Sequence, residues 1–179
     1  DLVPQLKNHE FSNTTVLSLS HLTELKKIRF QGNKLIIGSG ITLNELSEHP
    51  LILKHLPILS EITLLIASPQ IQNRATIGGN LLVANRCVYY NQSKTYQASK
   101  GVCFKGGGDN CHLIKNATCD DHPACRARFV SDLAPLFLLL DAKLNIIHPS
   151  RNITNRIIPI RIFYMDEGLC SHSLKPGNS

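Results

Sequence analysis

Apolar and polar positions repeat along the chain with two different periods, which together predict a mixture of strands and helices. Short apolar or alternating runs bounded by turn residues predict four strands, at residues 16–19, 34–38, 143–147 and 157–160. Apolar positions at helical spacing predict helices at residues 22–28, 43–48, 51–66 and 135–140, with an interruption near Pro57. Residues 31–33 are expected to form a turn and residues 68–74 a polar loop. Because strands and helices do not alternate strictly, we expect an α+β fold with a partly antiparallel sheet.

Two of these elements carry sharper local signals. Thr42 followed by Glu45 is the pattern of a capping box, so the helix at 43–48 is expected to begin after Thr42. Pro159 has no backbone N–H to donate, so the strand at 157–160 is expected at a sheet edge.

Composition indicates a folded chain of modest charge. Its 179 residues are 42% hydrophobic and 18% charged, which suits one domain or a domain with a small lobe. The longest apolar runs, such as 136–140, are too short to span a bilayer, so we expect no membrane segment. The net charge of +6 is too small to indicate a nucleic-acid partner. The chain opens at Asp1 without a Met and closes at Ser179, and we expect a fragment truncated at both ends.

Cysteine is concentrated in one stretch. Five of the six cysteines lie between residues 87 and 125, at Cys87, Cys103, Cys111, Cys119 and Cys125. Residues 86–128 also hold seven basic and three acidic residues, which is +4 of the net charge. A metal centre, disulfides or unligated thiols could each account for such a cluster, and zinc could also recruit His112 or His122. Disulfides would require an oxidising compartment, for which the sequence shows no signal.

A glycine pair precedes the cysteines, within Thr76-Ile77-Gly78-Gly79-Asn80. Two consecutive glycine N–H groups without a Cβ could bind a phosphate or pyrophosphate, although a plain tight turn has the same pattern. Gly106-Gly107-Gly108 is interpreted as slack between Cys103 and Cys111. No Ser-His-Asp or paired-carboxylate arrangement occurs, so we expect no catalytic residue of a hydrolase.

Three stretches in this order resemble one family: residues 37–46, 67–80 and 131–135. They are similar to the FAD-binding medium subunit of molybdenum hydroxylases, the xanthine dehydrogenase group. The resemblance implies a two-lobed FAD-binding domain of the PCMH/CO dehydrogenase flavoprotein type. Residues 1–32 would be the remainder of a small N-terminal lobe, with a glycine-rich loop upstream, and residues 33–179 the second lobe. It implies FAD contacts from Asp1, Thr76, Ile77, Gly78, Gly79, Asn80 and Asp132; Asp132 could instead cap the helix that follows it.

Residues 86–128 form an insert between the second and third of these stretches. Within it, residues 86–92 and 107–112 resemble the branch of the family represented by the β subunit of 4-hydroxybenzoyl-CoA reductase. That resemblance implies a [4Fe–4S] cluster bound by Cys87, Cys103, Cys111 and a fourth cysteine. Cys125 is expected to be the fourth ligand because it keeps its distance to Asp132, with Cys119 as the alternative.

The resemblance implies a cytoplasmic electron-transfer subunit with no catalytic residue of its own. A ferredoxin would reduce the cluster and then FAD. Electrons would continue through a [2Fe–2S] small subunit to a molybdopterin-binding large subunit, in a dimerised heterotrimer that forms benzoyl-CoA in aromatic degradation. One alternative is the FAD subunit of another molybdenum hydroxylase, acting on xanthine, an aldehyde or an N-heterocycle. A second alternative, from a different class, is a secreted disulfide-linked binding module without a cofactor.

Overall fold

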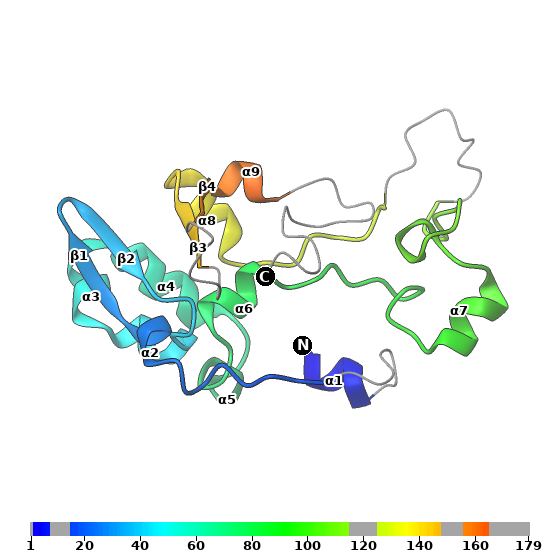
Figure 1. Cartoon of the computed structure of the whole chain (residues 1–179), viewed down its shortest axis with the longest axis horizontal. Coiled ribbons are helices and arrows are strands. Elements are labelled where there is room, and N and C mark those ends of the chain that lie inside the picture. Colours follow the sequence, from blue (N-terminus) through cyan, green and yellow to red (C-terminus); the bar gives the residue numbers. More distant parts are fainter. Residues whose placement is uncertain (1, 8–14, 115–124, 148–155, 165–179) are drawn as a thin grey trace. The chain divides into compact units, whose positions relative to one another are not determined.

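The computed structural model describes residues 2–7, 15–114, 125–147 and 156–164, and these divide into two compact units (Figure 1). One unit, here called the motif unit, consists of residues 15–83 and 131–139. The other comprises residues 1–14, 84–130 and 140–179. The expected boundary between residues 32 and 33 instead falls inside a hairpin of the motif unit. The expected limits of the insert, 86 and 128, lie close to the unit boundaries at 84 and 130.

The motif unit begins with an antiparallel hairpin. Its strands are β1 (Ile28–Gln31) and β2 (Lys34–Ile37), with Ile28 opposite Ile37. Gly32 has a left-handed φ of 60° in the tight turn between them, as expected for residues 31–33. Two predictions were wrong here: residues 16–19 form no strand, and residues 22–28 form only the short 3-10 helix η1 (Thr23–Lys26) followed by β1. Ile28 pairs with Ile37 of β2, and this pairing outweighs the helical spacing of Leu22, Leu25 and Ile28.

Three helices form the core of the motif unit, beside the hairpin in Figure 1. They are α2 (Leu43–Glu48), α3 (Pro50–His55) and α4 (Pro57–Leu65). The apolar side chains that they bury completely are Leu43, Leu46, Ile52 and Leu59. Proline stands in the first turn of both α3 and α4, where its missing N–H costs no hydrogen bond, so the predicted interruption near Pro57 is confirmed.

The predicted capping box is confirmed at the start of α2. The N–H and the hydroxyl of Thr42 both donate to Oε2 of Glu45 at 2.9 Å, and the N–H of Glu45 donates to Oγ1 of Thr42 at 3.2 Å. The hydrogen bond from the Thr42 backbone lowers the pKa of the Glu45 carboxyl. Thr42 is thereby fixed at the point where the first sequence motif turns into a helix.

Three further helices complete the motif unit: α5 (Pro69–Gln72), α6 (Ile77–Leu81) and α8 (Ala134–Leu139). Residues 68–74 were expected to be a polar loop, yet they contain α5. The reason is Gln72, whose buried amide donates to the carbonyls of Leu64 at 3.1 Å and Ile66 at 2.8 Å, at the end of α4. A polar side chain here satisfies helix-end carbonyls rather than facing water.

The other unit contains a second hairpin and most of the cysteines. Strands β3 (Lys143–Ile146) and β4 (Arg156–Pro159) pair antiparallel, and α9 (Ile160–Phe163) follows with two buried side chains. Both strands were predicted. Helix α1 (Leu2–Lys7) lies near the chain start, and the insert holds α7 (Lys94–Lys100) and the 3-10 helix η2 (Phe104–Gly106). None of the helices that the structure describes has the length and apolarity needed to cross a bilayer.

Candidate functional site

The first two sequence motifs lie side by side in the motif unit, as a pair of hydrogen-bonded loops. Thr42 and Thr76 form an antiparallel bridge. Three backbone hydrogen bonds flank it: Leu43 N–H to Ala75 O at 2.9 Å, Ile77 N–H to Ile41 O at 3.0 Å, and Gly78 N–H to Ser39 O at 2.8 Å. Both residues of the bridge also begin helices, α2 and α6. The bridge therefore fixes where both helices start.

The glycine pair has a different role from the one expected. The N–H of Gly78 donates to Ser39, and the N–H of Gly79 donates to Oγ1 of Thr76 at 3.1 Å, which caps α6. A Cβ on Gly78 would lie 2.8 Å from Ser39, so glycine allows the two loops to approach. The interpretation of these two N–H groups as a ready phosphate site was wrong, because the protein uses both internally.

Asn80 joins the third motif to the second. Its Oδ1 accepts hydrogen bonds from the Ser131 hydroxyl and the Leu133 N–H, both at 3.0 Å, and its Nδ2 donates to Oδ2 of Asp132 at 3.1 Å. The Ser131 hydroxyl in turn accepts from the N–H of Ala134, the first residue of α8, at 3.2 Å. Ser131, rather than Asp132, therefore supplies the side chain that supports the start of α8.

Two predicted contact residues of this site face outward. Gly79 is exposed, and a Cβ built there would meet only Oγ1 of Thr76, at 3.2 Å. Asp132 is also exposed, with one carboxylate oxygen turned to Asn80. Ile77, by contrast, is a core residue with 4% exposure. Asp1 lies outside the described residues.

The second site is a hollow in the insert that brings four cysteines together. Cys87, Cys103, Cys111 and Cys125 all line one small hollow that is partly open to solvent, and all four are free thiols. Its remaining walls are aromatic, apolar or basic: Tyr89, Tyr90, Phe104, Lys105, His112, Leu113 and Ala127. These are the four cysteines predicted as cluster ligands. Cys119, Cys170 and His122 lie outside the described residues.

The three consecutive glycines form a tight turn around Cys103, so their interpretation as slack was wrong. The carbonyl of Cys103 accepts from the N–H groups of Gly106 at 2.8 Å and Gly108 at 3.0 Å. Gly107 has a left-handed φ of 94°, and a Cβ on Gly108 would lie 1.9 Å from the carbonyl oxygen of Val102. The sequence shows the glycines, but the close approach to Val102 is a property of the folded turn.

Cys87 and Cys125 are placed by the two segments that enter and leave the insert. Arg86 and Arg128 form an antiparallel bridge between these segments. Beside it, Asn91 Oδ1 accepts from the N–H of Cys87 at 2.8 Å. Sγ of Cys125 accepts from the N–H of Ala127 at 3.4 Å. Two cysteines far apart in sequence are thereby fixed at one wall of the hollow.

The surroundings of Cys125 favour the neutral form of its thiol. Burial raises the pKa of Cys125, and the neighbouring thiols of Cys111 and Cys87 act in the same direction. The N–H of Ala127 and the ammonium of Lys105 oppose this rise. A metal that binds here must therefore displace a proton from Cys125.

His112 is part of the wall but is engaged elsewhere. Its Nε2 lies 2.8 Å from the carbonyl oxygen of Gly101, so this nitrogen acts as the donor, and its ring lies 5.3 Å from that of Tyr89. Within the described part of the chain, no three His, Cys, Asp or Glu side chains converge closely enough to hold a single metal ion. The four thiols therefore line a hollow without meeting at a position where one metal ion could bind.

Comparison with known proteins identifies the class to which these motifs belong. The model of one family, described as the FAD binding domain in molybdopterin dehydrogenase, matches residues 1–177. The chain therefore belongs to this family of FAD-binding domains.

Relatives of known function match parts of the chain. The carbon monoxide dehydrogenase medium chain of Hydrogenophaga pseudoflava is 35% identical over 80 residues, which is 45% of this chain and 28% of the relative. The nicotinate dehydrogenase FAD-subunit of Eubacterium barkeri is 36% identical over 81 residues, 45% of this chain and 27% of the relative. The chain thus spans between about a quarter and a half of the length of such relatives.

One match is much longer. The aldehyde oxidoreductase FAD-binding subunit PaoB of Escherichia coli K12 is 30% identical over 151 residues, 80% of this chain and 45% of the relative. Any continuous stretch that covers 80% of a chain of 179 residues includes residues 86–128. The insert is therefore inside this alignment.

The described residues fit the FAD that the family implies at one edge of the motif unit. The backbone at Gly79 is open to close approach, and the exposed Asp132 carboxylate can accept hydrogen bonds from a hydroxyl or ring N–H. When bound, FAD supplies reversible one- and two-electron chemistry. Asn80 positions both edges of this surface, because it lies next to Gly79 and holds Asp132.

Substituting Asn80 by Asp tests this positioning role. The new carboxylate could still accept from Ser131 and Leu133 but would place a negative charge against Asp132, so we expect a loss of about 2 kcal/mol in the free energy of unfolding at pH 7. Protonation of either carboxylate removes the repulsion, so the loss is relieved at acidic pH. Urea unfolding at several pH values measures this change in the free energy of unfolding. The double variant Asn80→Asp/Asp132→Asn, which restores a donor opposite an acceptor, should recover most of the stability; equal loss in both variants would contradict this role.

Proposed function

We propose that this chain is the FAD- and [4Fe–4S]-binding part of an electron-transfer subunit of a molybdenum-dependent oxidoreductase. Cys87, Cys103, Cys111 and Cys125 would bind the cluster in the insert. Thr76, Gly79 and Asp132 would contact FAD at the surface of the motif unit. The protein would then supply placement and electrostatics, and the two cofactors would carry the electrons.

The observation that carries the cluster proposal is the lack of any other core in the insert. Within its described part, Ala127 is the only buried residue, yet four cysteines line one hollow. A segment that buries so little apolar surface cannot offset the entropy lost on ordering its backbone. Binding of four thiolates to a metal centre would supply that free energy.

The state of the four thiols favours a cluster over a single zinc ion or a set of disulfides. A structural zinc ion requires four ligands about 2.0 to 2.3 Å from one point. A cluster of four irons and four sulfides keeps its four thiolates apart around a central body. The described thiols line a space without converging on one ion, and none of them is in a disulfide. A secreted disulfide-linked module is therefore the least favoured function for this chain.

For the whole enzyme, we propose reductive removal of the phenolic hydroxyl of 4-hydroxybenzoyl-CoA. Two electrons and two protons would enter, and benzoyl-CoA and water would leave. Support comes from the resemblance of residues 86–92 and 107–112 to that branch of the family. A reduced ferredoxin would donate the electrons, and a [2Fe–2S] small subunit and a molybdopterin-binding large subunit would pass them to the substrate.

Aldehyde oxidation is the second candidate, favoured by the long alignment with PaoB that includes the insert. The complete enzyme, assembled with its partner subunits, distinguishes the two. We expect the complete enzyme to form benzoyl-CoA from 4-hydroxybenzoyl-CoA when reduced ferredoxin is supplied. Chromatography of the thioesters measures this conversion. Aldehyde oxidation with an artificial electron acceptor, in the absence of benzoyl-CoA formation, would instead support the second candidate.

Iron and acid-labile sulfide analysis after anaerobic reconstitution tests the cluster. We expect about four irons and four sulfides per chain, and a loss of most of the iron in Cys87→Ser, Cys103→Ser, Cys111→Ser and Cys125→Ser. Cys119→Ser is the matched control, because it removes a thiol from the same insert, and it should keep its iron. The converse result, with iron retained by Cys125→Ser and lost by Cys119→Ser, would make Cys119 the fourth ligand. One zinc and no sulfide per chain would exclude the cluster.

Substituting Gly79 by Val should separate the flavin from the cluster. A branched side chain at this exposed position would block the approach of a cofactor to the backbone, so we expect at least a tenfold weaker affinity for FAD with the iron content unchanged. Flavin fluorescence titration of the full-length subunit measures this affinity, with Cys103→Ser as the reciprocal variant. Equal loss of flavin and iron in both variants would show that the two sites are not independent.

A further inference from the structure

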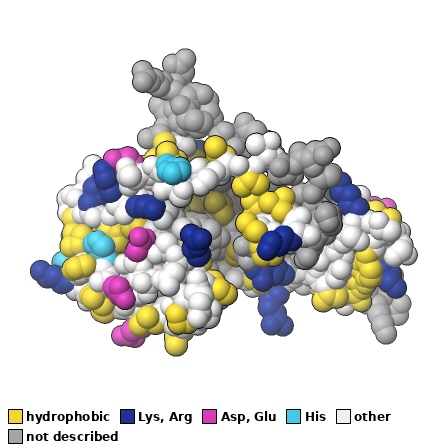
Figure 2. Space-filling model, turned by 90° about the horizontal axis from the view of Figure 1, so that it is seen from below, with side chains coloured by type: hydrophobic (Ala, Val, Ile, Leu, Met, Phe, Trp, Pro, Cys, Tyr) yellow, Lys and Arg dark blue, Asp and Glu magenta, His cyan; other side chains and the backbone are white. Residues whose placement is uncertain are grey.

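One cation is built into the wall of the cysteine hollow. In the described part of the insert, Lys105 is the only lysine or arginine that is half-buried, and it is the only one that lines the hollow. The other basic side chains there are exposed: Arg86, Lys94, Lys100, Arg126 and Arg128. On the face shown in Figure 2, magenta acidic side chains lie mainly over the motif unit.

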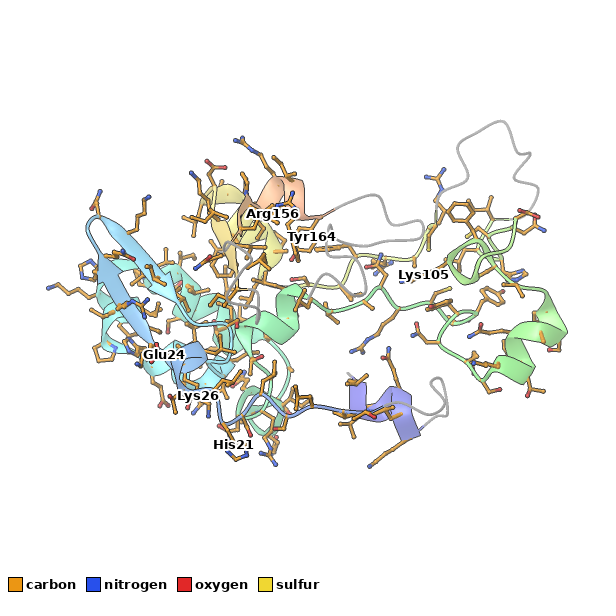
Figure 3. The ribbon with its side chains drawn as sticks, viewed as in Figure 1. His21, Glu24, Lys26, Lys105, Arg156 and Tyr164 are labelled. Atoms are coloured by element: carbon orange, nitrogen blue, oxygen red, sulfur yellow. The ribbon has the colours of Figure 1, made fainter. Side chains whose placement is uncertain are left out.

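Lys105 is held in place by two groups that do not carry a negative charge. Its Nζ donates to the backbone carbonyl of Asn85 at 3.2 Å and lies 5.1 Å from the centre of the Tyr90 ring. Figure 3 marks the position of Lys105. Asn85 is itself fully buried, and its side chain donates to the carbonyl of Ala127 at 3.2 Å. The ammonium is therefore held by a rigid carbonyl and an aromatic face, which keep it at the hollow without neutralising it.

No carboxylate compensates this charge among the residues that the structure describes. Neither of their ion pairs involves Lys105. Asp109 is the one acidic residue in the described part of the insert, and it is exposed. The ammonium of Lys105 lies close enough to Cys125 to act on it electrostatically, opposing the rise in the pKa of that thiol.

We propose that Lys105 sets the reduction potential of the cluster, an inference that rests on the function proposed above. Four thiolates give a [4Fe–4S] centre a net negative charge, and reduction adds one more electron. A fixed cation at the wall stabilises the reduced form more than the oxidised form and so raises the potential. The effect is strong because the site is partly shielded from water, whereas the exposed lysines and arginines are screened by solvent and salt.

The test is a redox titration of the anaerobically reconstituted full-length subunit, followed by electron paramagnetic resonance of the reduced cluster. Lys105→Gln should lower the midpoint potential by at least the equivalent of a tenfold change in the reduction equilibrium, about 59 mV for one electron. Lys105→Arg keeps the charge and should remain close to wild type. Lys94→Gln removes an exposed charge from the same insert and should shift the potential by less than a third of the Lys105→Gln shift.

The possible outcomes separate this inference from the proposed function. A wild-type protein that binds no iron and sulfide would overturn the cluster and, with it, the role of Lys105. A cluster present in all variants, with equal potentials in Lys105→Gln and Lys94→Gln, would overturn the role of Lys105 alone. Loss of the cluster from both Lys105→Gln and Lys105→Met, with retention in Lys105→Arg, would show that the charge serves assembly rather than potential and would also overturn the proposal.

Discussion

The side-chain amide of Asn80 is the constraint on which the candidate FAD surface of the motif unit depends. It binds Ser131, Asp132 and Leu133, which lie beyond the insert in sequence. The segments that come before and after the insert are thereby fixed to each other within the motif unit. Because the cost of closing a loop grows only with the logarithm of its length, a long excursion between two fixed ends adds little to the cost of folding. A cysteine-rich segment can therefore occupy this position without disturbing the motif unit.

The insert repeats the same arrangement on a smaller scale. The Arg86–Arg128 bridge closes its base, and the Cys103 turn is built on the carbonyls of Val102 and Cys103. Between these two points the described insert has polar and exposed residues but almost no buried ones. The backbone places the four thiols around the hollow. The bonds that would hold them together would come from the group that the thiols bind. This separation explains why the hollow is lined by cysteines from four distant positions rather than by a compact pair.

The sequence was sufficient for elements whose signals are local. The helix at Leu43–Glu48 needs only Thr42, Glu45 and apolar spacing, and the structure shows all three. The sequence was insufficient where the structure of a segment depends on residues that are distant along the chain. Ile28 was predicted to end a helix but begins β1, which pairs with β2. Gln72 was assigned to a polar loop, although its side chain binds carbonyls at the end of another helix. Lys105 was counted only as charge, since nothing in its neighbours predicts the carbonyl of Asn85 or the ring of Tyr90.

The glycine pair shows how a correct motif can carry a wrong mechanism. Gly78 is needed because Ser39 lies against it, and its N–H is used for the same contact. Gly79 closes the cap of α6 and leaves an open surface outward, next to the carboxylate that Asn80 holds. The glycine pair and Asn80 therefore connect three segments of the motif unit by hydrogen bonds and close contacts. The surface proposed for the cofactor results from these connections. A ligand at Gly79 and Asp132 would meet groups whose positions are already fixed by hydrogen bonds inside the protein, which reduces the entropy lost when it binds.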